Sequence, residues 1–468
     1  MSEEAEGERS YGAGARILSI GIAATGLVTF GYFALASHAL NPVEYKGVSL
    51  LWSVMFVIVS VIYRPIEQLL SRTIAERRAR GLHHGHPLRV PGLIQLGFAL
   101  VFLAVALPLH DTIVHDVFDG SSTLYWVLIA GVLAYAASYF ARGYLAGHER
   151  FGLYGGLVLL ESLSRFLFAL AVTVGIASGQ SAVALGIAAA PFVSLVVVPA
   201  AFSRRSGGGG PAGTPVADAA VAQGPASAEA EEAAGDLSLR GGSRFAGAVF
   251  GIQLAEQSLL NAAVIVVAAT STDRALAGFV FNVLLIARAP LQLFQAIQTS
   301  LLPHLTGLEA SDDAGSFEKT IRLTILVIAG FAGLVALGLL VIGPFAMKVL
   351  FGHHGHYERI GLAAVGLGMG FHLVAGTLNQ AALARGRAGL AAAAWLLSAA
   401  LFVGWVASSF MTDPVRRVEA GYLGATLLLS GMLYALYRRP GSEEEAPQSP
   451  PRGEQALRRP SRRRGSLR

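Results

Sequence analysis

Apolar runs of about twenty residues recur along most of the chain and are separated by short polar segments. A helix of that length crosses a bilayer, because each residue adds about 1.5 Å along the axis and the hydrocarbon core is about 30 Å thick. The pattern therefore predicts an all-α polytopic membrane protein with twelve transmembrane helices. The expected spans are 13–36, 46–66, 91–109, 123–145, 154–177, 181–203, 244–269, 275–302, 319–343, 358–384, 388–410 and 415–437.

Composition narrows the class of protein further. Hydrophobic residues make up 54% of the 468 residues and charged residues only 14%, against about 25% in soluble domains. Cysteine is absent, which excludes disulfides and thiolate chemistry. None of the lysines, Lys46, Lys319 and Lys348, follows a glycine, so the chain has no Walker A loop. We expect a protein that is not an enzyme, has no cofactor and does not bind nucleic acid.

Arginines gather in every second connection between the predicted spans. The connection 67–90 holds five of them, and the tail 438–468 holds nine. Loops rich in Lys and Arg stay on the cytoplasmic side of a membrane. The sequence therefore predicts a multi-pass membrane protein with both termini in the cytoplasm.

Two internal boundaries follow from changes in composition. The connection 204–243 is rich in Gly, Ala, Pro, Ser and Glu, and cannot bury a core. We interpret it as a disordered cytoplasmic linker between two halves. The predicted organisation is a cytoplasmic tail 1–12, a six-helix bundle 13–203, the linker 204–243, a second six-helix bundle 244–437 and a disordered basic tail 438–468.

The two predicted halves resemble each other. Arg64 and Gln68 end the second span, and Arg288 and Gln292 recur 224 residues later in the eighth. The ends of the fourth and tenth spans also match, at an offset of about 237 residues. Matching spans are an even number of segments apart, so this repeat is parallel and its axis lies along the membrane normal. Two such bundles related by a pseudo-twofold axis are typical of transporters.

A stripe of polar side chains runs along the eighth span. It consists of Arg288, Gln292, Gln295 and Thr299, spaced by four, three and four residues, as on one face of a helix. A charge in mid-membrane costs at least about 2.5 kcal/mol, so Arg288 is expected to face a watery cavity or a partner. A buried arginine bonded to backbone carbonyls is the alternative.

Similar polar faces occur in the second span, at Arg64 and Gln68, and in the seventh, at Gln257 and Asn261. Together they predict a polar cleft between the two bundles. Hydrogen bonds between helices are the alternative explanation for the uncharged residues. They account poorly for arginines at equivalent positions of both halves.

Arginine on both walls favours an anionic ligand. A guanidinium binds phosphate through two parallel hydrogen bonds and stays charged in apolar surroundings. Arg64 and Arg288 would suit a diphosphate. Glu256 in the seventh span either binds H⁺ or Na⁺ for coupling or neutralises a nearby arginine.

Three further charged residues are second-tier candidates for the site. Glu67 lies beside Arg64, and Glu161 and Arg165 stand four residues apart in the fifth span. That spacing favours an ion pair within one helix as much as a ligand role. The histidine-rich strings 83–86 and 353–356 lack acid or Cys partners at fixed spacing, so we predict solvated turns and no metal site.

Three strings carry a family resemblance: RPIEQ at 64–68, RGYLAGHERFGLYGGLVLLE at 142–161 and ARAPLQLFQAIQTSLLPHL at 287–305. With the predicted six-plus-six spans, they resemble the polysaccharide-flippase branch of the multidrug/oligosaccharidyl-lipid/polysaccharide exporter (MOP) superfamily. The resemblance covers nearly all of residues 13–437. It implies a MATE-like pair of bundles and alternating access. Span 1 lacks both the arginine pair of lipid II flippases and the acid of many MATE-type exporters.

The resemblance implies transfer of an undecaprenyl-diphosphate-linked oligosaccharide across the membrane for polysaccharide biosynthesis. The implied partners are the lipid-linked glycan, the bilayer, H⁺ or Na⁺, and other polysaccharide-assembly membrane proteins. One alternative is a cation-coupled multidrug exporter of the MATE type. Another is a membrane enzyme acting on polyprenyl-linked sugar, for which the acidic cluster Glu309, Asp312 and Asp313 would have to adjoin a pocket.

Overall fold

The computed structural model describes residues 21, 24–79, 88–148, 150–196, 199, 226–273, 275–286, 291, 314–352 and 357–439. In that part of the chain, nine helices are long and apolar enough to cross a membrane. They are α2 (Pro42–Ala79), α3 (Arg89–Ala106), α5 (Ser122–Gly147), α6 (Phe151–Thr173), α9 (Ala226–Thr270), α11 (Ala314–Phe351), α12 (Arg359–Ala384), α13 (Ala388–Ala407) and α14 (Pro414–Arg438).

Shorter helical segments complete this description. Two of them are apolar, α7 (Gly179–Ser194) and the helix Leu276–Ile286. Residues 24–39 are also helical, and α4 (His110–Thr112) leads into the π-helical turn η1 (Ile113–Val117). Each predicted span thus overlaps a helix, which confirms the all-helical class. The count of twelve crossings stays a prediction.

Helix α9 begins earlier than the sequence pattern suggests. It starts at Ala226, inside the range 204–243 that we assign to the linker, and its membrane-length apolar part is Gly247–Thr270. The run from Ala226 to Ala234 consists mainly of Ala and Glu, which have high helix propensity. A segment too polar to bury a core can therefore still extend the helix that follows it.

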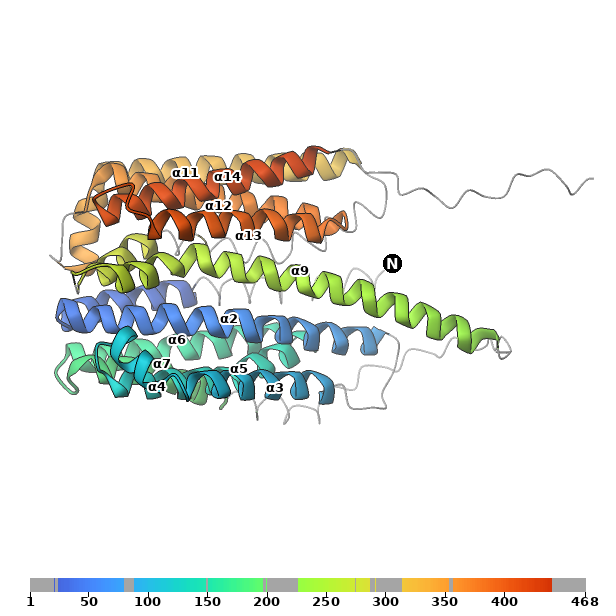
Figure 1. Ribbon diagram of the computed structural model, residues 1–468, viewed down its shortest axis with the longest axis horizontal. Coiled ribbons are helices and arrows are strands. Elements are labelled where there is room, and N and C mark those ends of the chain that lie inside the picture. The colour runs from blue at the N-terminus through green and yellow to red at the C-terminus, as the bar shows by residue number, and fades with distance from the viewer. Residues whose placement is uncertain are drawn as a thin grey trace, which may run out of the picture. The chain divides into compact units, whose positions relative to one another are not determined.

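The helices of residues 1–437 form one compact unit with two groups of contacts (Figure 1). Helix α2 packs on α3, α5 and α7, and α6 packs on α7 and α5. In the other group, α9 packs on α13, and α12 packs on α11 and α13. The two groups meet where α2 packs along α9. This contact is therefore where a site shared by the two halves would lie.

One pair of corresponding helices has the same length in both halves. Helices α5 and α12 both have 26 residues, and α12 begins 237 residues after α5. Burial repeats as well: the apolar segments of α3 and α11 are 17% and 22% buried, whereas those of α5 and α12 are 67% and 61% buried. These matches support the predicted internal repeat, and α3 and α11 are the helices with most surface left for lipid.

Glycines allow α5 to approach α2 closely. A methyl group at Gly143 would lie 2.8 Å from the backbone oxygen of Glu67, and one at Gly147 would lie 2.7 Å from the side chain of Ile74. Neither position has room for a larger residue. The two glycines are four residues apart, the spacing of small residues at close helix contacts. These two contacts place the part of α2 that carries Arg64 against α5.

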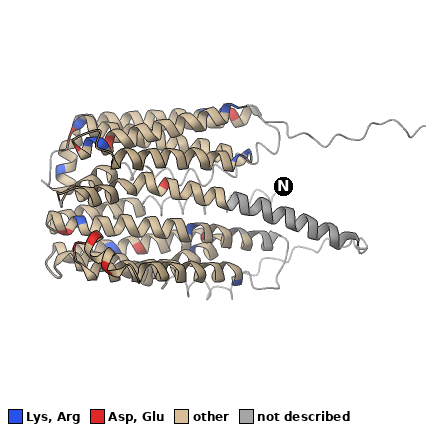
Figure 2. Ribbon diagram, in the orientation of Figure 1, with Lys and Arg blue, Asp and Glu red and all other residues tan. Residues whose placement is uncertain are grey.

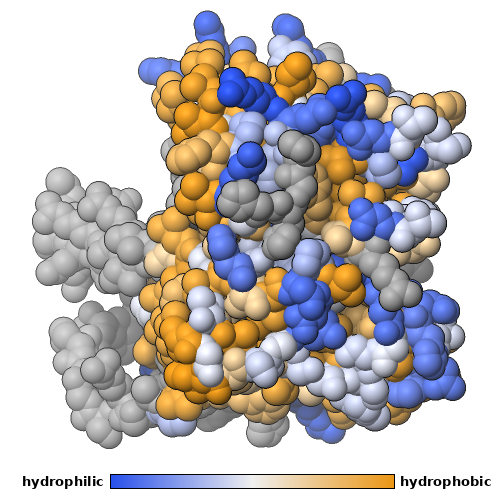
Figure 3. Space-filling model, turned by 90° about the vertical axis from the view of Figure 1, so that its left-hand side faces the viewer, coloured by the Kyte–Doolittle hydropathy of each residue, from blue (hydrophilic) through white to orange (hydrophobic). Residues whose placement is uncertain are grey.

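Charged residues lie mostly toward the two ends of the helices, with a few in the middle (Figure 2). At the end where α2 begins, hydrophilic residues cover much of the surface and hydrophobic ones flank it (Figure 3). This distribution is expected of helices whose ends meet water and whose sides meet lipid. The few charges in the middle are the ones that need an explanation.

Candidate functional site

Arg64 lies on α2 at the contact between the two halves. Its side chain is half-buried, and it attracts Glu67 on its own helix and Glu256 on α9. Among the described residues its guanidinium has no hydrogen bond and no direct ion pair. A cation near the end of a span that is close to two acids but bonded to neither keeps its donors available for a ligand.

Glu256 lies on α9 and faces α12. Its carboxylate Oε1 is 3.9 Å from His372 Nε2, and its side chain keeps 24% of its surface exposed, against 4% for His372. It also attracts Arg64. The sequence left open whether Glu256 binds an ion or neutralises an arginine. The geometry supports neutralisation of Arg64 and adds a histidine that could take part in ion binding.

His372 is the residue that the sequence reasoning missed. It lies inside the apolar run 358–384, where an ionisable side chain is by default a candidate for function. That signal was present in the sequence, but the two histidine-rich strings were the more conspicuous pattern. Residues 83–86 and 353–356 of those strings lie outside the described part of the chain. The structure instead brings His372 to Glu256, 116 residues earlier in the chain.

Some of the other predicted site residues lie in the described part of the chain and some lie outside it. Of those described, Gln257 and Asn261 are buried and hydrogen-bond to each other along α9, with Asn261 Nδ2 3.1 Å from Gln257 Oε1. Gln68 is exposed. The stripe of the eighth span and the acidic cluster of the enzyme alternative lie outside the described residues. They are Arg288, Gln292, Gln295, Thr299, Glu309, Asp312 and Asp313.

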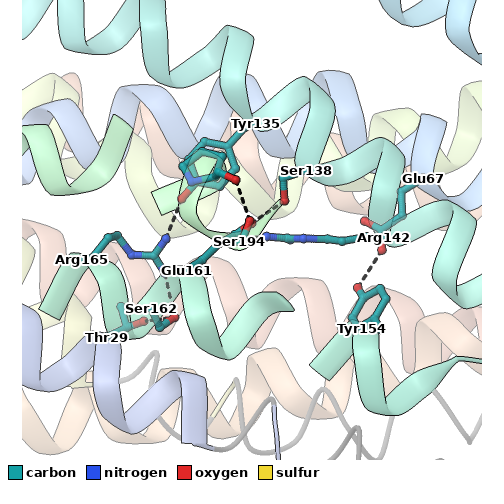
Figure 4. Close-up of polar contacts among 11 residues, drawn as sticks. Thr29, Glu67, Tyr135, Ser138, Arg142, Tyr154, Glu161, Ser162, Arg165 and Ser194 are labelled. Carbon is teal, nitrogen blue, oxygen red and sulfur yellow. Dashed lines mark hydrogen bonds and ion pairs between the residues drawn. The ribbon is translucent and has the colours of Figure 1, made fainter. Parts of the chain in front are cut away.

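A second group of charges lies buried inside the N-terminal half (Figure 4). Glu161 on α6 forms an ion pair with Arg142 on α5, and its carboxylate also accepts hydrogen bonds from Ser138 and Ser194. Arg165 instead donates to Tyr135 and Ser162. The ion pair expected between Glu161 and Arg165 within one helix is therefore wrong. Glu161 faces α5, where Arg142 reaches it directly.

Glu67 connects this buried group with Arg64. Its Oε1 accepts a hydrogen bond of 2.7 Å from Tyr154 on α6, and it attracts both Arg64 and Arg142 (Figure 4). Positive and negative side chains thus alternate from the core of the N-terminal half to the contact with α9. The order is Arg142, Glu67, Arg64 and Glu256. A substitution that removes the charge of Arg64 therefore changes the electrostatic surroundings of an acid in each half, Glu67 and Glu256.

A separate contact joins the two halves at the beginning of α2. Tyr45 donates a hydrogen bond to Asn282, and a methyl group at Gly278 would lie only 3.1 Å from the Tyr45 ring. Phe279 stacks on Tyr357, with ring centroids 4.4 Å apart. We call Tyr45, Gly278, Phe279, Asn282 and Tyr357 the Tyr45 latch. Burial raises the pKa of the Tyr357 phenol to about 12, so the ring stays neutral at physiological pH.

The Tyr45 latch and Arg64 lie far apart on α2. Nineteen residues separate positions 45 and 64, which corresponds to about 28 Å along a helix. That distance is close to the thickness of the hydrocarbon core, about 30 Å. The two halves are therefore hydrogen-bonded at one end of the membrane span, while Arg64 attracts Glu256 toward the other end without a direct bond.

Sequence comparison finds no relative. No family model matches the chain, and no curated protein matches it. The fold is nevertheless shared with solved structures. A multidrug resistance MATE family transporter of the MOP superfamily in an inward-facing conformation superposes with a TM-score of 0.60 at 14% identity, over 91% of this chain and 93% of that one. The chain has the fold of MATE transporters.

Two further structures agree with this result. An outward-facing multidrug resistance MATE family transporter gives a TM-score of 0.59 at 17% identity, over 91% of this chain and 94% of that one. A mutant of the Vibrio cholerae MATE transporter VcmN gives 0.57 at 15% identity, over 92% and 97%. Identities this low show a MATE-like fold and leave the substrate to be argued from this chain's own residues.

Proposed function

We propose that this protein is an alternating-access transporter that moves a lipid-linked oligosaccharide, joined to its lipid by a diphosphate, across a bacterial inner membrane. The observation that carries the proposal is Arg64, a half-buried cation at the contact of the two halves that lacks a direct partner among the described residues. The MATE-like fold supports transport, and the cation supports an anionic cargo. The predicted topology would leave both termini in the cytoplasm.

A diphosphate would suit this position for two reasons. The guanidinium can form two parallel charge-assisted hydrogen bonds to phosphate oxygens, and it cannot lose its charge by deprotonation. A diphosphate also carries more negative charge than a single carboxylate, so it would compete for Arg64 against Glu67 and Glu256. Arg288 remains the proposed second donor from the C-terminal half.

Competition at Arg64 would also link binding to movement. Arg64 attracts an acid of each half, Glu67 on α2 and Glu256 on α9. A bound diphosphate would replace the attraction between Arg64 and Glu256 that draws α2 and α9 together. Such a change in the contacts between two rigid bundles is the kind of event that alternates access.

We predict that the Arg64→Gln variant binds diphosphate at least tenfold more weakly than the unaltered protein. A hydrogen bond to a charged group contributes about 1.5–3 kcal/mol, which corresponds to roughly 10–150-fold in affinity. The probe is geranyl diphosphate, titrated calorimetrically into purified protein in detergent. Arg89→Gln is the matched control, because Arg89 is an exposed arginine at the start of α3 and should leave affinity unchanged.

Equal affinity in Arg64→Gln and Arg89→Gln would remove the basis for an anionic cargo. A fluorescent prenyl diphosphate in proteoliposomes extends the test to transport. Dithionite destroys label in the outer leaflet, so the rate of signal loss reports movement between leaflets. We expect Arg64→Gln to slow it and Arg89→Gln to leave it unchanged.

A second candidate function is cation-coupled export of amphipathic drugs. The observation in its favour is the acid Glu256, accessible at the contact of the halves and next to His372. This function predicts a drug-stimulated proton or sodium flux that the Glu256→Gln variant abolishes, measured in the same proteoliposomes with ethidium as the drug. Ethidium transport without any effect of Arg64→Gln would favour it over the flippase.

A further inference from the structure

We propose that Tyr154 is a positioning residue of the anion site: its hydroxyl holds the carboxylate of Glu67 away from Arg64, so that the guanidinium stays open to the cargo. The inference rests on the proposed function for the identity of the cargo. The arrangement of the three side chains does not depend on the cargo and can be measured without it. Tyr154, on α6, thereby gains a role at the contact of α2 with α9.

Glu67 is the acid best placed to block Arg64. Both residues lie on α2, three positions apart, a spacing at which side chains on a helix are neighbours. Their charges attract each other, yet in the described part of the chain no hydrogen bond or direct ion pair joins them. Another contact must therefore keep the Glu67 carboxylate from a partner that lies within its reach.

That contact is the hydrogen bond from Tyr154. The hydroxyl of Tyr154, in the first turn of α6, donates to Glu67 Oε1 over 2.7 Å (Figure 4). Arg142 on α5 also attracts Glu67. Both of these partners belong to the N-terminal half, whereas Arg64 also attracts Glu256 on α9. The carboxylate of Glu67 is thus held toward α5 and α6.

Packing fixes both ends of this hydrogen bond. The Tyr154 ring packs against a small apolar cluster whose buried members are Leu145 of α5 and Leu157 of α6. At the other end, a methyl group at Gly143 would lie only 3.1 Å from Glu67 Cα, so α5 lies directly against that part of α2. These contacts involve neither the hydroxyl nor the carboxylate. A Tyr154→Phe substitution therefore keeps the ring in place and removes only the hydroxyl.

Loss of the hydroxyl would release Glu67 toward Arg64. The carboxylate would lose the hydrogen bond that it accepts from Tyr154, and Arg142 already forms an ion pair with Glu161. Arg64 is then the neighbouring arginine with donors to spare. With Glu67 bonded to Arg64, a diphosphate would have to displace a carboxylate before it could bind. The Tyr154 hydroxyl should therefore raise the affinity for the cargo without touching it.

We expect Tyr154→Phe to bind geranyl diphosphate about tenfold more weakly than the unaltered protein in the calorimetric titration, the loss typical of one hydrogen bond to a charged group. Glu67→Gln removes the competing charge and should bind at least as tightly as the unaltered protein. Tyr125→Phe is the matched control. It removes a hydroxyl that donates to the backbone oxygen of Ala106, at the end of α5 remote from Gly143, and should leave the affinity unchanged.

A double variant separates positioning from packing. In Glu67→Gln with Tyr154→Phe no carboxylate remains to be released, so the affinity should equal that of Glu67→Gln alone. If Tyr154 acted only by packing, its substitution would weaken binding equally in both backgrounds, and that result would overturn the proposal. A Tyr154→Phe protein that binds the probe as tightly as the unaltered protein would overturn it as well.

The reactivity of Arg64 reports the same arrangement without cargo. Phenylglyoxal modifies arginines that are accessible and unpaired, and mass spectrometry of the peptide that contains Arg64 gives the rate. We expect Tyr154→Phe to slow modification of Arg64 several-fold, and the added Glu67→Gln substitution to restore it. Arg89, exposed at the start of α3, is the internal reference and should react at the same rate in every variant.

Failure of this inference differs from failure of the proposed function. Diphosphate binding that does not depend on Arg64 would contradict the proposed function, and the modification rates would still decide whether Tyr154 keeps Arg64 open. Binding that depends on Arg64, with affinity and modification rate both unaffected by loss of the Tyr154 hydroxyl, would contradict this inference alone.

Discussion

The Glu161→Ala variant is expected to lose about 3–5 kcal/mol of unfolding free energy, the cost typical of removing one partner from a buried ion pair. Glu161 is 1% exposed and accepts bonds from Arg142, Ser138 and Ser194. Its removal leaves the Arg142 guanidinium buried without that counter-charge. Unfolding in mixed dodecyl maltoside and SDS micelles, followed by the helical circular dichroism signal, measures the loss.

Two control variants separate charge from general damage. The double variant Glu161→Gln with Arg142→Gln removes both charges and should be more stable than Glu161→Ala, because no uncompensated charge remains. Glu358→Ala removes an acid from the exposed pair with Arg416, where the expected loss is much smaller because water screens the two charges. Equal losses for Glu161→Ala and Glu358→Ala would mean that the buried pair contributes no more than a surface one.

Cross-linking the Tyr45 latch is expected to stop transport of the fluorescent prenyl diphosphate completely. The chain has no cysteine, so Tyr45→Cys with Asn282→Cys gives one pair of thiols in an otherwise unreactive protein. The two native side chains are hydrogen-bonded, so a short bifunctional thiol reagent should bridge the cysteines. If the two halves must separate at this end during alternating access, the bridged protein cannot complete a cycle.

Reversal by a reducing agent is the decisive part of this experiment. A reagent that attaches through disulfides is removed by dithiothreitol, which should restore transport to the rate before cross-linking. Each single-cysteine variant treated with the same reagent should transport normally. Full transport by the bridged protein, with bridging verified by mass spectrometry, would show that this end does not open.

The positions of the helices could be predicted because lipid imposes a simple rule on sequence. A span must be apolar over its whole length and must satisfy its backbone hydrogen bonds internally. The period and length of the apolar runs can therefore be read from the sequence without knowing the tertiary structure. The ends of α5 and α12 show this well, since the repeat seen in sequence at an offset of about 237 residues returns as two helices of equal length.

The partners of the charged residues could not be predicted in the same way. Glu161 and Arg165 have ideal spacing for a pair on one helix, yet Glu161 pairs with Arg142 on α5. Which of two nearby arginines a carboxylate meets depends on how two helices are rotated against each other. That rotation is set by the packing of their apolar and small residues.

The sequence by itself determined that this protein is a bundle of apolar helices, and it placed the ionisable groups Arg64 and Glu256 within predicted spans. Two related halves are a prediction from the internal repeat. Only the tertiary structure decided that Arg64 attracts Glu256 across the contact of α2 with α9, and that His372 stands next to Glu256. The physical reason is how far apart in the sequence the interacting residues lie. Burial of a helix in lipid depends on residues close in sequence, whereas these contacts between helices join residues far apart in sequence, 192 positions for Arg64 and Glu256 and 116 for Glu256 and His372.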